Sequence, residues 1–324
     1  MKVLMFGRGM ISTVYGWALA QAGHEVEFYV RPGRAAIYAD AVELDLIDMR
    51  RRWRGERVIE TWAARYREDL AADHDFDLIV VSLPHHRLAE AASFLAPRIG
   101  AATVLIFGNV WAEPLEAISP LPAEQVAWGF PGAGGGCGAD GVFRGTLSPS
   151  VVFGTLDLPL SQRERDVRQL FREAGFGIQE QSDFRGWLWL HFISDAGLHS
   201  QSVRVGALAD LRGAPDDLRE ALLATRELLP LLEARGVDLR RHRAAVLPFR
   251  APARLTALGF SWLITHVAAA RVNFEAHSDP AAEEPRAICR DTLDEARRHG
   301  IAAPRLEAAE IHLHGGGPAG SDQR

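Results

Sequence analysis

Three polar residues, His191, Asp195 and His199, are spaced four apart in an otherwise largely apolar segment of the chain. On an α-helix this spacing places all three on one face, where an imidazole and a carboxylate one turn apart can interact. Imidazole titrates near neutral pH, so such a residue can give or take a proton during a reaction. Because burying these groups is costly unless they are paired or face a cleft, the alternatives are a catalytic stripe and a satisfied His–Asp pair in a core.

A second group of residues has the chemistry of a nucleotide phosphate site. The apolar run at residues 2–6, typical of a buried strand, leads into Gly7-Arg-Gly9-Met-Ile-Ser12, and a helical pattern follows. In such a turn the first glycine permits a tight bend, and the second lets the backbone approach a pyrophosphate at the helix N-terminus. Ser12 stands where a third glycine or alanine is usual, and it is small enough to keep the helix close to the strand. A further strand predicted over residues 25–30 favours a dinucleotide site over a plain structural turn.

The end of that further strand bears on which dinucleotide binds. NAD sites usually carry Asp or Glu there, where the carboxylate binds the ribose 2′-hydroxyl. Glu25 and Glu27 come too early in the strand for this role, whereas Arg31 and Arg34 follow it. Guanidinium groups suit a 2′-phosphate, which a carboxylate would repel, so the pattern favours NADP over NAD. The alternative is that both arginines are solvated surface residues.

Two more apolar runs, residues 78–82 and 103–107, are typical of buried strands in a parallel sheet. Strand ends line the ligand crevice of such a sheet, so we expect Asn109 near the nicotinamide, unless it is only a turn residue. The cofactor contacts are therefore expected from Gly7, Gly9, Met10, Ile11, Ser12, Arg31, Arg34, Leu83 and Asn109.

Two unusual stretches lie within the same half of the chain. The basic run 50–54, flanked by strand-like segments, indicates a solvated hairpin or loop rather than a nucleic-acid site. The glycine-rich stretch 129–138 predicts close approach of the backbone to a ligand, or a mobile lid. Cys137 within it is expected to be a bystander thiol, because no base is adjacent to it in sequence.

The order of predicted elements divides the chain into two domains. Strands and helices alternate as far as an edge strand predicted at residues 175–179, and the pattern then becomes almost wholly helical. We therefore predict an α/β fold in which residues 1–181 form a Rossmann-type dinucleotide-binding domain. Residues 182–312 are predicted to form a helical substrate or dimerisation domain, and residues 313–324 a disordered tail.

Composition excludes several classes of function. With 48% apolar residues the chain is an ordinary globular protein, and its net charge of −6 argues against nucleic acid as a partner. No run reaches the roughly 20 apolar residues of a membrane span, and the first residues do not have a signal-peptide pattern. The two cysteines, Cys137 and Cys289, make no disulfide framework, so we expect a reducing cytoplasm. The single lysine, Lys2, leaves no catalytic lysine in the middle of the chain.

These motifs resemble those of the ketopantoate reductase family, the 2-dehydropantoate 2-reductases. The resemblance lies in Gly7-x-Gly9, Gly23-His24-Glu25-Val26 and Arg31, in Asp77–Leu83 and Asn109, in the helix that contains Trp189, and in Gly300-Ile-x-x-Pro304. It implies a Rossmann-type domain followed by a helical substrate domain, with the reaction in the cleft between them. It also implies NADPH as cofactor, with Arg31 at the 2′-phosphate and Asn109 near the nicotinamide.

The same resemblance shows where this chain departs from the family. The family's catalytic lysine lies two residues after the tryptophan, and His191 stands at that position. The asparagines four and eight residues later are replaced by Asp195 and His199, and a second family lysine is replaced by Pro84. The substrate-binding carboxylate, twenty residues before Pro304, is kept as Glu284.

Hydride transfer from a nicotinamide to a carbonyl or imine carbon builds negative charge on the oxygen or nitrogen, which then needs a proton. We therefore predict an NADPH-dependent reductase of a 2-keto acid or a related carbonyl or imine, with His191 in place of the lysine and Asp195 holding it. Glu284 would anchor a substrate hydroxyl or amine, and His199 and Asn109 would contact the substrate. Two alternatives stay open: an NADP-binding redox sensor or scaffold without catalysis, and a helical domain that serves mainly to form a homodimer.

Overall fold

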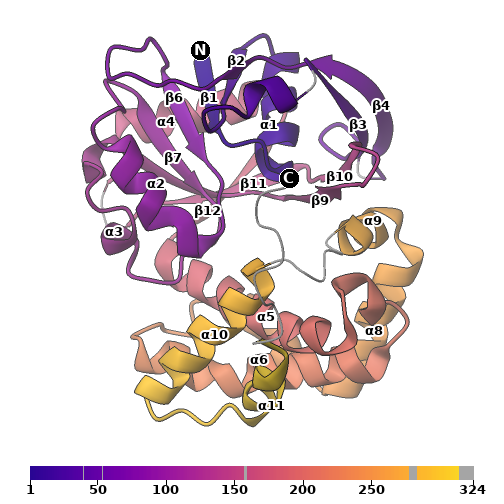
Figure 1. Ribbon diagram of the computed structural model, residues 1–324. Coiled ribbons are helices and arrows are strands. Elements are labelled where there is room, and N and C mark those ends of the chain that lie inside the picture. Colours follow the sequence, from indigo (N-terminus) through magenta and orange to yellow (C-terminus); the bar gives the residue numbers. More distant parts are fainter. Residues whose placement is uncertain (39, 53, 157–158, 277–282, 314–324) are drawn as a thin grey trace. The chain divides into compact units, whose positions relative to one another are not determined.

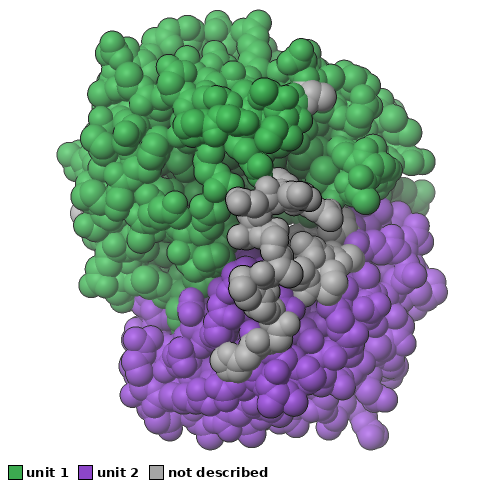
Figure 2. Space-filling model, viewed as in Figure 1, with its two compact units in different colours: residues 1–185 green, residues 186–324 purple. Residues whose placement is uncertain are grey.

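The computed structural model describes residues 1–38, 40–52, 54–156, 159–276 and 283–313 (Figure 1). The chain divides into two compact units, Met1–Arg185 and a second that begins at Gly186 (Figure 2). Unit 1 is α/β and unit 2 is helical, so the predicted fold class is confirmed. The predicted tail, residues 313–324, lies outside the described residues except for Leu313, which ends the last helix.

The larger sheet of unit 1 has eight strands in the order β12-β11-β8-β7-β6-β1-β2-β5. All neighbours in it are parallel except β8 and β11. Its central strands are apolar because both faces of a parallel sheet are covered. The strands are β1 (Lys2–Phe6), β2 (Glu25–Tyr29), β5 (Tyr66–Arg67), β6 (Leu78–Val81), β7 (Thr103–Phe107), β8 (Val126–Phe130), β11 (Ser150–Gly154) and β12 (Gly177–Gln181).

A second sheet of four strands has the order β4-β3-β10-β9. It contains β3 (Ala41–Asp48), β4 (Glu56–Ala63), β9 (Ala133–Cys137) and β10 (Phe143–Leu147). The basic run 50–54 connects β3 to β4, which pair antiparallel from Asp48 opposite Glu56 onward, so the predicted hairpin is confirmed.

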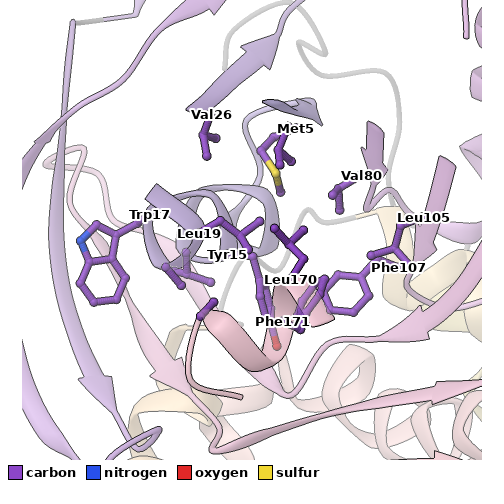
Figure 3. Close-up of a cluster of buried hydrophobic side chains, with 14 of the residues drawn as sticks. Met5, Tyr15, Trp17, Leu19, Val26, Val80, Leu105, Phe107, Leu170 and Phe171 are labelled. Atoms are coloured by element: carbon purple, nitrogen blue, oxygen red, sulfur yellow. The ribbon is translucent and has the colours of Figure 1, made fainter. Parts of the chain in front are cut away.

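Helix α1 (Met10–Gln21) packs against both sheets, which explains why the eight residues from Ser12 to Leu19 are all buried. Toward the larger sheet, a Cβ added at Gly16 would lie 3.0 Å from Phe28 and 3.3 Å from Met5. Toward the second sheet, Tyr15 accepts a 2.8 Å hydrogen bond from the backbone N–H of Gly132. Burial raises the pKa of the Tyr15 phenol. Figure 3 shows the α1 side chains Tyr15, Trp17 and Leu19 among strand and helix residues Met5, Val26, Val80, Leu105, Phe107, Leu170 and Phe171.

The glycine-rich stretch does not form the predicted ligand-facing loop or lid, because residues 133–137 are strand β9, paired antiparallel with β10. Its glycines make room for protein atoms instead. A Cβ at Gly135 would lie 2.2 Å from the Arg144 carbonyl oxygen and 2.6 Å from Met10 Cε. A Cβ at Gly145 would lie 2.3 Å from the same Met10 atom. The close approach that the glycines permit is therefore between the second sheet and the first residue of α1.

The remaining elements of unit 1 are the helices α2 (Leu88–Leu95), α3 (Pro114–Ala117) and α4 (Gln162–Glu173) and the short 3-10 turns η1 (Ala35–Ile37), η2 (His85–Arg87) and η3 (Ala123–Gln125). Helix α4 begins with a capping box in which Ser161 and Glu164 satisfy each other's backbone N–H groups.

Unit 2 consists of α5 (Phe184–Val205), η4 (Leu208–Leu211), α6 (Pro215–Ala234), α7 (Arg243–Arg250), α8 (Ala253–His266), α9 (Ala268–Ala276), α10 (Glu283–Arg298) and α11 (Pro304–Leu313). Helix α5 starts two residues before the unit boundary and continues into its core. It crosses α6 at Gly197, where an added Cβ would lie 2.1 Å from Thr225 Oγ1. Among the described residues, no single helix is long and apolar enough to cross a membrane. Helices α8 and α9 together reach that length and apolar content, but the chain bends by 90° between them.

Candidate functional site

The turn from β1 to α1 has the geometry that a dinucleotide pyrophosphate needs. Gly7 has a φ of +99°, a left-handed conformation that favours glycine. Gly9 caps the helix with extended backbone and has no atom within 4 Å of the position that a Cβ would take. No acidic residue lies in the first turn of α1, so the N–H groups that follow Gly9 can bind an anion.

Two buried hydroxyls at the start of α1 give an independent sign of a ligand. Within the part of the chain that the structure describes, Ser12 Oγ and Thr13 Oγ1 have no hydrogen-bond partner. Buried polar atoms normally have one, since an unmet hydroxyl costs about 1–3 kcal/mol. The open space at Gly9, the N–H groups and these hydroxyls together fit a nucleotide diphosphate.

The carboxyl ends of three neighbouring strands meet beside this turn. Leu83, just after β6, lies with its Cδ2 atom 3.8 Å from the Cβ position of Gly7. Its carbonyl oxygen lies 3.6 Å from the Cβ position of Gly108, just after β7. The structure therefore brings the predicted residues Gly7 and Leu83 together, with half-buried Asn109 following Gly108 at the same edge of the sheet.

The predicted arginines lie in the turn that follows β2. Arg31 is exposed and Arg34 is half-buried, and the Arg34 N–H donates to the Arg31 carbonyl at 3.0 Å. Gly33 between them has a φ of +80°, so the turn again depends on a glycine. In a Rossmann-type sheet this turn is adjacent to the adenosine ribose of a bound dinucleotide.

Two charged residues near these turns were missed by sequence reasoning. The Arg8 guanidinium lies 4.6 Å from the ring centre of Tyr38 and 5.2 Å from that of Phe143, and its Nε donates to Tyr66 Oη at 2.8 Å. Glu68 follows the short strand β5, and its Oε1 accepts from the Ala35 N–H at 2.6 Å. Arg8 lies within the glycine motif itself, whereas pairing of β5 with β2 brings Glu68 to the second turn, and no motif in the sequence signals that pairing.

In unit 2, the structure brings together the two predicted acid–base residues of α5. His191 Nε2 lies 3.6 Å from Asp195 Oδ2, and the side chains are 36% and 26% exposed. Both side chains are partly exposed, which favours a pair that faces a cleft over one enclosed in a core. The indole of Trp187 stacks on the His191 ring with centroids 5.4 Å apart and planes at 15°. One turn beyond Asp195, His199 Nδ1 lies 3.2 Å from Ser202 Oγ.

The opposite face of α5 fixes the direction in which this pair points. Trp189 is fully buried, and Arg235 lies 3.6 Å above its ring while also pairing with Glu295 at 3.7 Å. Helix α10 contacts α5 where Cys289 Sγ donates to the Ala196 carbonyl at 3.6 Å.

Glu284 lies half-buried in the first turn of α10. Burial raises the pKa of the Cys289 thiol, and the nearby Asp195 carboxylate raises it further.

Across the described residues, no group of three or more His, Cys, Asp or Glu side chains could hold a metal ion.

Comparison with known proteins shows which family the first half of the chain resembles. Residues 3–157 match the family model described as Ketopantoate reductase PanE/ApbA. This stretch belongs to the ketopantoate reductase family. The resemblance predicted from the sequence is thereby confirmed, whereas the roles it implies for Arg31, Asn109, His191 and Glu284 stay predictions. No curated protein matches the chain in sequence.

Solved ketopantoate reductase structures are similar in fold over nearly the full length of the chain. A 2-dehydropantoate 2-reductase from Geobacter metallireducens is 16% identical with a TM-score of 0.67, covering 97% of this chain and 99% of that one. A probable 2-dehydropantoate 2-reductase from Bacillus subtilis is 19% identical with a TM-score of 0.65 and covers the same shares. A dimeric ketopantoate reductase from Staphylococcus aureus is 14% identical with a TM-score of 0.63, covering 97% of each chain.

Proposed function

We propose that this chain is an NADPH-dependent reductase of the 2-dehydropantoate 2-reductase type, acting on a 2-keto acid or a related carbonyl or imine. The observation that carries the proposal is the turn from β1 to α1, with its open space at Gly9 and a helix N-terminus without acidic residues. The family match supports an oxidoreductase that acts on a CH–OH group. The substrate class is taken from the names of the similar structures.

Residues of unit 1 would hold the cofactor, whose nicotinamide supplies a hydride to the substrate carbon. The N–H groups from Met10 onward bind the pyrophosphate oxygens, while Gly7 keeps the turn tight. Arg31 and Arg34 bind the 2′-phosphate through charge-assisted hydrogen bonds. Ile11, Ser12, Leu83 and Asn109 complete the proposed contacts.

His191 is proposed to donate the proton that the substrate oxygen or nitrogen needs as the hydride arrives. The support for this role is a half-exposed ring with a carboxylate one helical turn away. Asp195 acts as a positioning residue, because its oxygen 3.6 Å from Nε2 favours one orientation of the ring. In the oxidative direction the same imidazole accepts the proton.

Glu284 is proposed to bind a hydroxyl or amine of the substrate, with His199 and Asn109 as further contacts. The support for Glu284 is that it lies in the same unit as His191, on a helix, α10, that packs on α5 through Cys289 and Ala196. A carboxylate accepts a hydrogen bond from a hydroxyl or an ammonium group, which selects substrates that carry one.

A panel assay tests the proposed activity. NADPH oxidation is followed at a fixed cofactor concentration with 2-keto acids, ketopantoate among them, and with ketones and imines. We expect turnover with at least one 2-keto acid. The main alternative, an NADP-binding sensor or scaffold, is motivated by the missing lysine. That alternative predicts NADPH binding without oxidation by any compound in the panel, and this result would overturn the catalytic proposal.

A homodimer is proposed as the assembly state. Helix α8 exposes an apolar stripe that consists of Leu255, Leu258, Trp262 and Leu263, and Val267 follows it. Exposed apolar patches of this kind mark protein interfaces more often than isolated residues do. The Staphylococcus aureus protein of the same fold is described as dimeric, which supports a second copy of this chain as the partner that covers the stripe.

A cytoplasmic location remains a prediction from the cysteine content.

A further inference from the structure

The turn after β2 already holds an anion that belongs to the chain itself. Glu68 Oε1 accepts from the Ala35 N–H at 2.6 Å. The backbone N–H groups of Gly33 and Ala35 lower the pKa of this carboxylate. Successive N–H groups that converge on one point form an anion-binding concavity. In this structure the carboxylate of Glu68 occupies it.

The strand register explains how a residue so far along the chain reaches this turn. Strand β5 runs parallel to β2, with Tyr66 opposite Phe28 and Arg67 opposite Tyr29. Both strands therefore end at the same edge of the sheet, and Glu68 follows β5 just as Val30 follows β2. Glu68 thus brings a carboxylate to the end of the second strand, a place where NAD sites carry one on the strand itself.

The charges around the turn oppose one another. Arg31 and Arg34 attract the 2′-phosphate of NADP, whereas the Glu68 carboxylate repels it and takes the backbone donors that the phosphate oxygens would use. A ribose 2′-hydroxyl is uncharged and can donate to a carboxylate, so NAD suffers no such repulsion.

We propose that Glu68 sets the discrimination between NADP and NAD at this site by limiting the preference for NADP. Its carboxylate occupies the backbone N–H donors of the Gly33–Ala35 turn, so the 2′-phosphate cannot use them. This inference rests on the proposed function, since it concerns the cofactor of the same site. Its consequence is that removal of one negative charge, without loss of the turn, makes the site more selective for a 2′-phosphate. Glu68→Gln is the variant of choice because the amide oxygen can still accept from the Ala35 N–H.

Binding of two cofactor fragments tests the proposal without requiring turnover. Dissociation constants of 2′,5′-ADP and 5′-ADP are measured by calorimetry on the full chain, for the wild type and for Glu68→Gln, Glu68→Ala and Asp73→Asn. We expect Glu68→Gln to bind 2′,5′-ADP about fivefold more tightly, with 5′-ADP unchanged, as befits one partly screened charge. Asp73→Asn removes an equal charge from an exposed position and should change neither constant.

The outcomes distinguish a failure of the inference about Glu68 from a failure of the proposed function. If Glu68→Gln weakens both ligands or changes neither, Glu68 only braces the turn and the inference is wrong, while the proposed function stands. If no variant and no wild-type protein binds either ligand, the proposed function itself fails, and the inference fails with it. Circular dichroism verifies that each variant folds, and Glu68→Ala removes the same charge should the Gln variant not fold.

Discussion

His191 Nε2 lies 3.6 Å from Asp195 Oδ2 on the half-exposed face of α5, while Trp189 on the same helix is fully buried. The buried tryptophan fixes the rotation of the helix, so the imidazole and the carboxylate face away from the core together. The proposed reduction needs a proton donor, and this arrangement provides a candidate whose position is set by packing.

His191→Ala tests that candidate. We expect kcat for substrate reduction to fall about 100-fold or more, the usual effect of removing a general acid. Affinity for NADPH should not change, because the proposed nucleotide contacts lie in unit 1. His266→Ala is a matched control, since Trp262 stacks on His266 at 5.3 Å and 17°, much as Trp187 stacks on His191. Equal turnover in both variants would remove His191 from the mechanism.

Gly9→Ala tests the phosphate turn. No atom lies within 4 Å of the new Cβ and the φ of Gly9 is −77°, so the melting temperature should stay within a degree or two of wild type. The methyl group would occupy space that a pyrophosphate approaches, and NADPH should bind about tenfold more weakly. Fluorescence titration with NADPH measures this. Undiminished affinity would mean that the nucleotide does not lie against Gly9.

Gly197→Ala tests the packing that supports α5. The new Cβ would lie 2.1 Å from Thr225 Oγ1 and 2.7 Å from the Ala221 carbonyl oxygen, so α5 and α6 must move apart. We expect the free energy of unfolding to fall by about 1–3 kcal/mol, as for other overpacked cores. Gly259→Ala, in a helix with open space at that position, should instead gain about 0.5–1 kcal/mol. Denaturant titration of both variants should show opposite signs, and equal signs would contradict the close helix crossing.

His24 should make stability depend on pH. Burial lowers the pKa of its imidazole below the ordinary 6.5, and the Glu173 carboxylate only partly opposes this. The unfolded chain therefore binds the proton first, so stability from this residue is present above pH 6.5 and is lost as pH falls below it. In thermal melts from pH 7.5 to 5, His24→Gln should lose less stability than wild type does. Parallel curves would show that His24 titrates as it does in the unfolded chain.

Trp262→Ser tests the proposed dimer. Trp262 is 59% exposed on the apolar stripe of α8, so a polar residue there should shift light-scattering mass toward the monomer at micromolar concentration. Leu115→Ser, which changes an exposed apolar residue of α3 in unit 1, should leave the mass unchanged. A wild-type protein that is monomeric at all concentrations would exclude the dimer.

The sequence predicted the elements whose residues form a clear local pattern. Residues 2–6, 78–82 and 103–107 were predicted as buried strands, and β1, β6 and β7 lie there within a residue. Continuous apolar runs of this length are typical of strands covered on both faces. The His191–Asp195 pair was also predictable, because a spacing of four on one helix face is enough to bring the two side chains together.

Elements that depend on tertiary pairing were not predictable in this way. The three central residues of strand β9 are glycine, which has low strand propensity and no side chain to show alternation, so only its pairing with β10 reveals it. Glu68 reaches the turn after β2 because a two-residue strand, β5, pairs with β2. No local pattern reports a strand that short, and the arginines alone therefore gave an incomplete picture of the charges at this turn.

The position of the only lysine has a practical consequence for handling the protein. Lys2 begins β1, whereas Gly7 follows the other end of that strand at the phosphate turn. Amine-coupling reagents can attach at Lys2 and at the α-amine of Met1 beside it, at the end of β1 opposite the proposed phosphate turn. Biotin or a sensor surface joined there would leave the turn exposed to ligand, so immobilised protein should report cofactor affinities close to those in solution.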